Sequence, residues 1–249
     1  MESFPDHFSP VSEGYSQFRP RYPAALFEWL ASLPTRHEQV WDVGTGNGQA
    51  ALDLVPYFPR ILATDASQAQ IREATPHPKI EYRVSPADQS DLPAGSVDLI
   101  TVAQALHWFD LPAFYAEATR VLAPGGVVAA WTYGILQHEV RSINDRLQHF
   151  YSVEMGPWWP PNRHMVETSY RTVPFPFREI SAPPFEISAS MSLPDLVGYL
   201  RTWSSVIRFS AGRGYDPVTV LERDLTPAWG DPSARSTIRW PIGMRVGRF

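Results

Sequence analysis

The sequence predicts an α/β fold in which helices cover both faces of one doubly wound, mostly parallel sheet. Short apolar runs of strand length recur from residue 39 onward, and stretches with helical periodicity lie between them. A glycine-rich turn joins the first of these strands to the helix that follows it. This alternation is typical of βαβ units, whose strands lie parallel in a sheet that is covered on both sides.

The composition limits the classes of function. The chain has 249 residues, of which 44% are hydrophobic, so it can bury a substantial core. Its net charge of −5 gives no general attraction to nucleic acid or to anionic membranes. The absence of cysteine excludes disulfides, thiolate catalysis and cysteine-ligated metal sites. We find no secretory signal and no apolar run near the ~18 residues of a transmembrane helix, so we expect a cytoplasmic protein.

The elements of the first half follow in a regular order. Residues 1–22 are irregular but rich in aromatic side chains, so we expect this arm to fold back onto the body. Pro23 suits the first turn of a helix over PAALFEWLASL. The predicted strands are QVWDVG, RILATD, IEYRVS, SVDLITVAQAL and GGVVAAWTYG, and the predicted helices between them are GQAALDLVPYF, SQAQIREAT and LPAFYAEATRVL.

The alternation ends after Tyr133. Residues 136–152 have a helical pattern, and residues 153–177 are rich in proline, tryptophan and arginine. We expect one helix over Leu193–Phe209, with Ser192 as its N-terminal cap. The last stretch, STIRWPIGMRVGRF, predicts an antiparallel final strand that is broken by Pro241.

The glycine-rich turn lies in VWDVGTGNGQAALDL. Ligands of doubly wound sheets bind beyond the carboxyl ends of the strands, where glycine lets a ligand approach the backbone. A dinucleotide fingerprint starting at Gly44 needs a third glycine at position 49, which is occupied by Gln49. A Walker loop needs a lysine, and none is nearby. The turn therefore argues against both phosphate-binding motifs but does not identify the ligand.

Two carboxylates extend the predicted site along the same edge of the sheet. Asp65 ends the second strand, where an acidic side chain can accept hydrogen bonds from both hydroxyls of a ribose. Asp88 follows the third strand, where a carboxylate can accept the exocyclic amine of an adenine. Because NAD and S-adenosylmethionine share this ribose, Asp65 alone does not distinguish them.

Residues 38–133 resemble the class I S-adenosylmethionine-dependent methyltransferases. The resemblance rests on VWDVGTGNGQAA, TDAS, PADQSDLP, VDLITVAQALHWFD and RVLAPGGVVAAW, in this order and at this spacing. In addition, YSQFRPRYP and RTWSS are similar to stretches of the methyltransferase type 11 group that includes trans-aconitate-methyltransferase-like enzymes. The resemblance implies a Rossmann-like fold with S-adenosylmethionine as the cofactor.

The resemblance also assigns roles along the cofactor. Gly44, Thr45 and Gly46 would line its methionine half, while Gln104 and Ala105 would present backbone beneath the sulfonium. Asp65 with Ala66 would hold the ribose, and Ala87 with Asp88 would bracket the adenine. On the arm, Tyr15 and Arg19 would close over the site, with Arg19 pairing with the methionyl carboxylate. Trp108 would form either a pocket wall or core. The cofactor-binding residues implied are Tyr15, Arg19, Gly44, Thr45, Gly46, Asp65, Ala66, Ala87, Asp88, Gln104, Ala105 and Trp108.

Catalytic and substrate-binding residues are less defined by the sequence. His107, in QALHWFD, is the candidate general base for a substrate hydroxyl, and its alternatives are a structural histidine that bonds a local carbonyl or one that shapes the cofactor pocket. Trp158 and Trp203 could form an apolar substrate cage or pack the cap. Arg201 could pair with a substrate carboxylate. The spacing of the histidines predicts no metal site.

These observations predict an S-adenosylmethionine-dependent methyltransferase of a small molecule, with a carboxylate or hydroxyl oxygen as the acceptor. The alternatives are an NAD(P)-dependent oxidoreductase, or a methyltransferase-fold protein that binds the cofactor for other chemistry. We expect no nucleic acid or membrane partner, and the oligomeric state is left open. The prediction is one domain, 1–249, made of an arm and helix (1–37), a cofactor-binding core (38–133), a substrate cap (134–210) and a C-terminal helix with the final strand (211–249).

Overall fold

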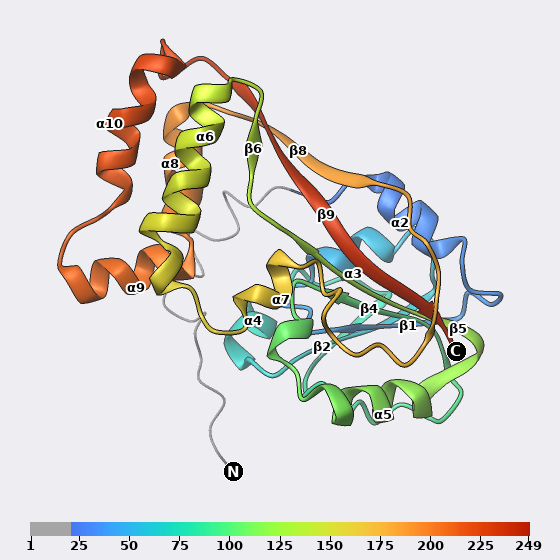
Figure 1. Cartoon of the computed structure of the whole chain (residues 1–249). Coiled ribbons are helices and arrows are strands. Elements are labelled where there is room, and N and C mark those ends of the chain that lie inside the picture. Colours follow the sequence, from blue (N-terminus) through green and yellow to red (C-terminus); the bar gives the residue numbers. More distant parts are fainter. Residues whose placement is uncertain (1–20) are drawn as a thin grey trace.

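The computed structural model describes residues 21–249, which form a mixed sheet with helices on both faces (Figure 1). The order across the sheet is β3-β2-β1-β4-β5-β9-β6, and β7 and β8 pair with β9. Strands β1 to β5 are parallel, and β9 runs antiparallel to β5. The strands are β1 (Gln39–Val43), β2 (Arg60–Asp65), β3 (Ile80–Val84), β4 (Val97–Ala103), β5 (Leu122–Tyr133), β6 (Gln137–His138), β7 (Arg178–Glu179), β8 (Phe185–Met191) and β9 (Ser236–Arg248). The predicted fold class is confirmed.

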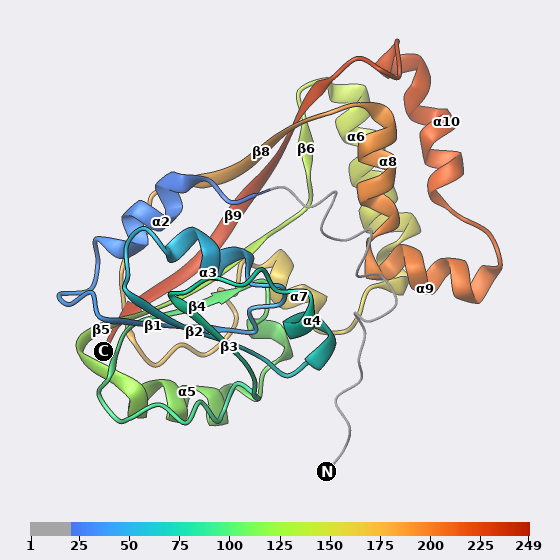
Figure 2. The same cartoon turned by 180° about the vertical axis from the view of Figure 1, so that it is seen from behind.

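The central parallel strands β1, β4 and β5 are mostly buried because both faces of the sheet are covered. The helices α2 (Ala24–Ala31) and α3 (Gln49–Leu54) lie on one side, and α5 (Leu111–Val121) lies on the other (Figures 1 and 2). Successive residues of β1 point to opposite faces, so that Val40 packs with α2 and α3 while Trp41 packs with α5. The short helix α4 (Gln68–Arg72) follows β2 and is capped by Ser67.

Strand β9 is shared by two parts of the sheet. Its second half pairs with β5 from Ile242 to Arg248, and its first half pairs with β8 from Ser236 to Ile242. The expectation that Pro241 breaks this strand was wrong. The register places Pro241 opposite Glu186 of β8 and leaves no residue of β5 or β6 opposite it, so the missing N–H removes no ladder bond on that side.

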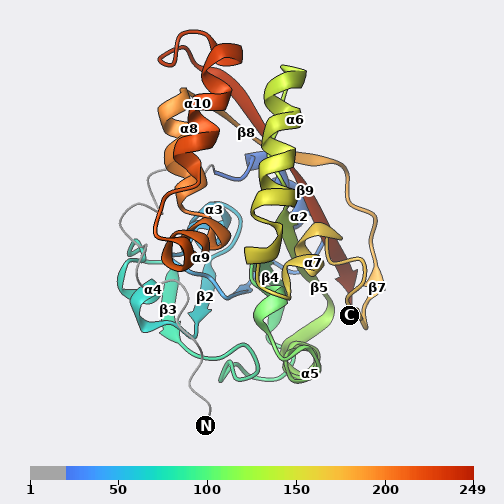
Figure 3. The same ribbon diagram turned by 60° about the vertical axis from the view of Figure 1, so that its left-hand side comes forward.

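A helical cap lies beyond one end of the sheet (Figure 3). It consists of α6 (Arg141–His149), α8 (Leu193–Arg201), α9 (Ser204–Arg213) and α10 (Val218–Trp229), and α7 (Arg163–Glu167) lies between the cap and the core. Ser192 caps α8 through a reciprocal capping box with Asp195, as predicted. The single helix expected over Leu193–Phe209 was wrong, because the chain turns at Thr202 and Trp203 between α8 and α9.

The cap has its own apolar core, formed by helices and by the outer half of β9. Leu147 of α6, Leu196 of α8, Leu221 of α10 and Trp240 of β9 are all fully buried there. Among residues 21–249, no helix is long and apolar enough to cross a membrane.

Candidate functional site

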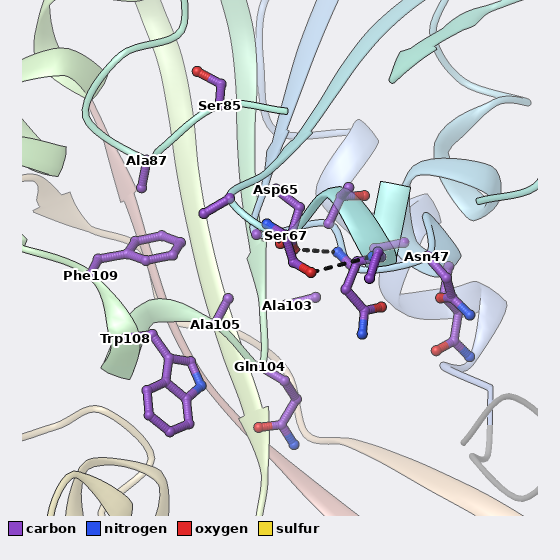
Figure 4. Close-up of a pocket in the computed structure, with 18 of the residues that line it drawn as sticks. Asn47, Asp65, Ser67, Ser85, Ala87, Ala103, Gln104, Ala105, Trp108 and Phe109 are labelled. Atoms are coloured by element: carbon purple, nitrogen blue, oxygen red, sulfur yellow. Dashed lines mark hydrogen bonds between the residues drawn. The ribbon is translucent and has the colours of Figure 1, made fainter. Parts of the chain in front are cut away.

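A cavity of about 1070 Å³ opens at the carboxyl ends of β1, β2, β3 and β4. Figure 4 shows side chains from these four strand ends turned toward the same space. The cavity is lined by Arg21, Tyr22, Gly44, Thr45, Gly46, Asn47, Gln49, Ala50, Leu52, Asp53, Asp65, Ala66, Ser67, Gln68, Ala69, Gln70, Arg72, Thr75, Ser85, Pro86, Ala87, Asp88, Ala103, Gln104, Ala105, Trp108, Phe109 and Asp110. The cavity therefore lies at the edge of the sheet where the sequence analysis predicted ligand binding.

The glycine turn after β1 forms one wall of this cavity. Gly44, Gly46 and Gly48 have φ values of 65°, 58° and 87°, in the left-handed region that favours glycine. A Cβ atom on Gly48 would lie within the contact distance of the Tyr82 ring. These positions need glycine for the conformation of the turn as well as for close approach, so backbone atoms rather than side chains face the ligand.

Asp65 connects the two turns that follow β1 and β2. Its carboxylate accepts hydrogen bonds from the backbone N–H of Gly46, at 2.9 Å, and from that of Ser67, at 2.8 Å (Figure 4). Both turns line the cavity together with Asp65 itself. The carboxylate is thereby fixed in the wall of the cavity.

Asp42 lies beneath the glycine turn and is fully buried. Its two carboxylate oxygens accept hydrogen bonds from the hydroxyls of Thr45, at 2.5 Å, and Thr101, at 2.7 Å. Burial raises the pKa of Asp42 to about 6, although both of these hydrogen bonds act to lower it. A buried carboxyl group with a raised pKa therefore lies behind the glycine turn, outside the cavity lining.

The segment after β3 supplies the wall next to Asp65. Ala87 and Asp88 both line the cavity, as the resemblance implied. Ser90, two residues after Asp88, is anchored to α5. The Glu117 carboxylate accepts hydrogen bonds from the backbone N–H of Ser90, at 2.9 Å, and from its hydroxyl, at 2.5 Å. Hydrogen bonds from Arg120 and Ser90 lower the pKa of Glu117 to about 2, so this anchor stays ionised.

The segment after β4 forms the wall that adjoins the glycine turn at Gly44. Gln104, Ala105, Trp108 and Phe109 line the cavity there and point into the space shown in Figure 4. Phe109 was missed by the sequence analysis, although it follows Trp108 directly in the HWF triplet. Gln104 has a φ of 57°, which is unusual for a residue with a long side chain.

His107 is not among the described residues that line the cavity. Its Nδ1 lies 3.0 Å from the hydroxyl of Tyr170, which is fully buried. Burial, followed by the charge of Arg163, lowers the pKa of His107 to about 3. The ring is therefore neutral at physiological pH but is a weak base, and its immediate contacts are those of a structural histidine.

The predicted substrate residues of the cap lie away from this cavity. Trp203 packs edge-on against Tyr151 and beside Trp159, and Trp158 packs edge-on against Phe209. The Arg201 Nε donates to Asp216 at 2.7 Å. Trp158, Arg201 and Trp203 are absent from the described cavity wall, so their contacts support packing and ion pairing rather than binding of a ligand there.

Two predicted cofactor residues, Tyr15 and Arg19, lie outside the described residues. Just after them, Arg21 and Tyr22 do line the cavity, and so does Asp53 of α3. Sequence reasoning missed these three, although Arg21 and Tyr22 belong to the YSQFRPRYP stretch. Within residues 21–249, no group of three or more histidine, aspartate or glutamate side chains could hold a metal ion.

Comparison with known proteins identifies the family. A family described as a methyltransferase domain matches residues 41–130. The chain is 33% identical to a methyltransferase homologue of Dictyostelium discoideum, over 98% of this chain and 95% of that protein. The chain belongs to the class I S-adenosylmethionine-dependent methyltransferases. This methyltransferase also matches a solved type II methyltransferase homologue from Anaeromyxobacter dehalogenans with 44% identity and a TM-score of 0.88, over 93% of this chain and 98% of that one.

A third relative comes from Saccharomyces cerevisiae and is named as an S-adenosylmethionine-dependent methyltransferase. It is 29% identical over 64% of this chain and 59% of its own length. The family assignment confirms the resemblance that the sequence motifs indicated, and it removes the NAD(P)-dependent oxidoreductase alternative.

Proposed function

We propose that this methyltransferase transfers the methyl group of S-adenosylmethionine to an oxygen of a small molecule, with a carboxylate as the first choice and a hydroxyl as the second. The observation that supports this most directly is the cavity. Its volume of about 1070 Å³ is slightly above the ~300–1,000 Å³ typical of ligand pockets. A cofactor and a small acceptor can therefore occupy it together.

The lining residues fit this cofactor. The glycine turn lets a ligand approach its backbone closely at Gly44 and Gly46, which carry no side chains, and this suits a methionine moiety that carries no phosphate. Asp65 would accept the ribose hydroxyls in addition to its two backbone donors. Asp88 would accept the adenine amine, and Ala66 and Ala87 leave room for the flat base. Gln104 and Ala105 would lie beneath the sulfonium.

The reaction needs little acid–base chemistry from the protein. When bound, the cofactor supplies a methyl group already activated on a sulfonium. The walls of the cavity align the acceptor and exclude water, and alignment of this kind supplies roughly 7–11 kcal/mol in favourable cases. A carboxylate acceptor is ionised at neutral pH, so no side chain has to remove a proton.

A hydroxyl acceptor would need a base, and His107 remains the proposed candidate. Its low pKa, its contact with Tyr170 and its place outside the cavity wall favour the carboxylate acceptor over the hydroxyl. A carboxylate acceptor also agrees with the similarity of YSQFRPRYP to the trans-aconitate-methyltransferase-like group.

Titration calorimetry with S-adenosylhomocysteine tests this proposal. We expect the full-length protein to bind it, and we expect Asp65→Ala to weaken binding at least about 100-fold, since two charge-assisted hydrogen bonds contribute roughly 1.5–3 kcal/mol each. Arg72→Ala is the matched control, because it changes a charged lining residue to which we assign no contact with the cofactor. Binding of NAD without binding of S-adenosylhomocysteine would contradict the proposal.

A further inference from the structure

Asp53 on α3 brings a carboxylate to the wall of the cavity. It follows Gln49 and Ala50 by one helical turn, and all three residues line the cavity. Its Oδ2 is buried and accepts no hydrogen bond from any of residues 21–249. Buried carboxylate oxygens are normally hydrogen-bonded, because their loss of hydration is costly. This oxygen therefore lacks the partner that its environment demands.

The other carboxylates of the cavity wall already have a role. The charged residues that line the cavity are Arg21, Asp53, Asp65, Arg72, Asp88 and Asp110. Asp65 accepts from two backbone N–H groups, and Asp110 caps α5 by accepting from the backbone N–H of Ala113 at 3.2 Å. Asp88 belongs to the segment after β3, to which we assign the adenine. Asp53 has neither a structural hydrogen bond of this kind nor an assigned ligand group.

Arg21 is the cationic neighbour of Asp53. Both residues line the cavity, and the charge of Arg21 opposes the rise in the pKa of Asp53 that burial causes. No hydrogen bond or ion pair joins the two side chains in the described part of the chain. Two opposite charges that lie near each other without pairing suit a ligand group that itself carries both charges.

The amino-acid end of S-adenosylmethionine is a group of this kind, with an ammonium and a carboxylate on one carbon atom. We place the methionine half of the cofactor at Gly44 and Gly46, and α3 begins at Gln49, directly after this turn. The amino-acid end can therefore extend along the cavity-facing side of α3. An ammonium group has three N–H donors, and a carboxylate oxygen can only accept, so Asp53 matches the ammonium.

We propose that Asp53 binds the α-ammonium group of the cofactor through its carboxylate. This inference rests on the proposed function and extends it to the amino-acid end of the ligand. Asp53 then recognises the cofactor without taking part in the transfer of the methyl group. The site thereby distinguishes the cofactor from other adenosine thioethers, which share its ribose and adenine but lack the ammonium.

Titration calorimetry on the full-length protein with two ligands tests the role of Asp53. One is S-adenosylhomocysteine, and the other is its deamino analogue, which keeps the thioether and the carboxylate and lacks only the amino group. We expect the wild-type protein to bind S-adenosylhomocysteine at least about tenfold more tightly, because the analogue cannot form the charge-assisted hydrogen bond. Asp53→Asn should reduce this preference, since a neutral amide oxygen is a weaker acceptor, and Asp53→Ala should abolish it.

Asp110→Asn is the matched control, because it also removes a carboxylate from the cavity wall and should leave the preference unchanged. If the Asp53 variants lose affinity for both ligands equally, Asp53 has a structural role and the proposal is overturned. Equal affinity of the wild-type protein for the two ligands would also overturn it, without any variant that has to fold. Failure of the wild-type protein to bind S-adenosylhomocysteine would instead contradict the proposed function.

Discussion

A Cβ atom on Gly44 would lie 2.5 Å from the Cβ atom of Ala105, across the floor of the cavity. This distance is well inside the contact of two carbon atoms, so the backbone of the turn after β1 lies directly against the Ala105 side chain of the segment after β4. We expect Gly44→Ala to push these two segments apart and to abolish measurable binding of S-adenosylhomocysteine. Calorimetry on Gly44→Ala measures the loss of affinity, and thermal unfolding of the same variant measures the loss of stability.

Gly95 provides the matched control for this substitution. Its φ of 66° is nearly that of Gly44, at 65°, but a Cβ atom there would meet nothing within 4 Å. Gly95→Ala should therefore lose only the about 1–2 kcal/mol of stability that left-handed strain costs, and it should keep its affinity for S-adenosylhomocysteine. Equal loss of affinity in both variants would show that strain, rather than the contact with Ala105, accounts for the effect.

The pKa of about 6 at Asp42 predicts a pH dependence of cofactor binding. S-adenosylmethionine brings positive charge to the turn above Asp42, which favours the ionised carboxylate and lowers its pKa on binding. Affinity should therefore rise as the pH increases through 6, by about tenfold for each unit by which the pKa falls. S-adenosylhomocysteine, which lacks the sulfonium charge, should show a smaller change.

Calorimetry at pH 5 and pH 7.5 measures this difference. Asp42→Asn, which cannot ionise, should flatten the dependence for both ligands. If the wild-type protein and Asp42→Asn show the same dependence on pH, Asp42 is not the group that titrates. Thermal unfolding of the variant checks that Thr45 and Thr101 still hold the turn.

The lowered pKa of His107 predicts loss of stability in acid. The unfolded chain protonates this histidine near pH 6.5, whereas the folded protein resists protonation until about pH 3. The free energy of unfolding should therefore fall as the pH drops below 6.5, by at most about 2 kcal/mol at pH 5 from this residue. Urea unfolding should show a shallower pH dependence for His107→Gln than for the wild type. His164→Gln, at an exposed position on α7, controls for removal of a histidine.

Arg201 should act as a surface ion-pair residue rather than as a substrate ligand. Its side chain is 47% exposed and pairs with Asp216, which supports α8 against the loop before α10. We expect Arg201→Ala to cost less than about 1 kcal/mol and to leave the affinity for the cofactor unchanged. Arg146 is the informative comparison, because it is 21% exposed and pairs with both Glu154 and Asp224. A large rise in KM for an identified acceptor in Arg201→Ala would restore its predicted substrate role.

The cofactor half of the site was predictable because it depends on local signals. Short stretches of the sequence contain these signals: the glycine spacing, a carboxylate at a strand end, and the alternation of strands and helices. Asp65 and Asp88 line the cavity as expected. The rest of the site depends on contacts between residues that lie far apart in the sequence. His107 meets Tyr170 63 residues later in the chain, and this contact turns a candidate base into a partly buried hydrogen-bonding group.

The cap shows the same limit at the level of secondary structure. The sequence around Leu193–Phe209 has a helical pattern throughout, but the chain turns at Trp203 to place its indole beside Tyr151 and Trp159, both from an earlier segment. Strand β8 did carry a signal, since Ile187 and Met191 alternate with exposed residues. Its partner β9 lies about 50 residues further on, so no local feature of the sequence indicated that the two strands pair.

The sharing of β9 between core and cap has a consequence for how the protein folds during synthesis. Strand β5 gains its antiparallel neighbour only from Ile242–Arg248, and the backbone N–H of Phe249 bonds to the carbonyl of Gly126. The edge of β5 therefore stays unpaired until residues 242–248 have been synthesised. An open strand edge can pair with other chains, so the nascent core has to remain shielded while more than a hundred residues of cap and final strand are added. Residues 242–248 thus complete this edge of the sheet and end the exposed stage.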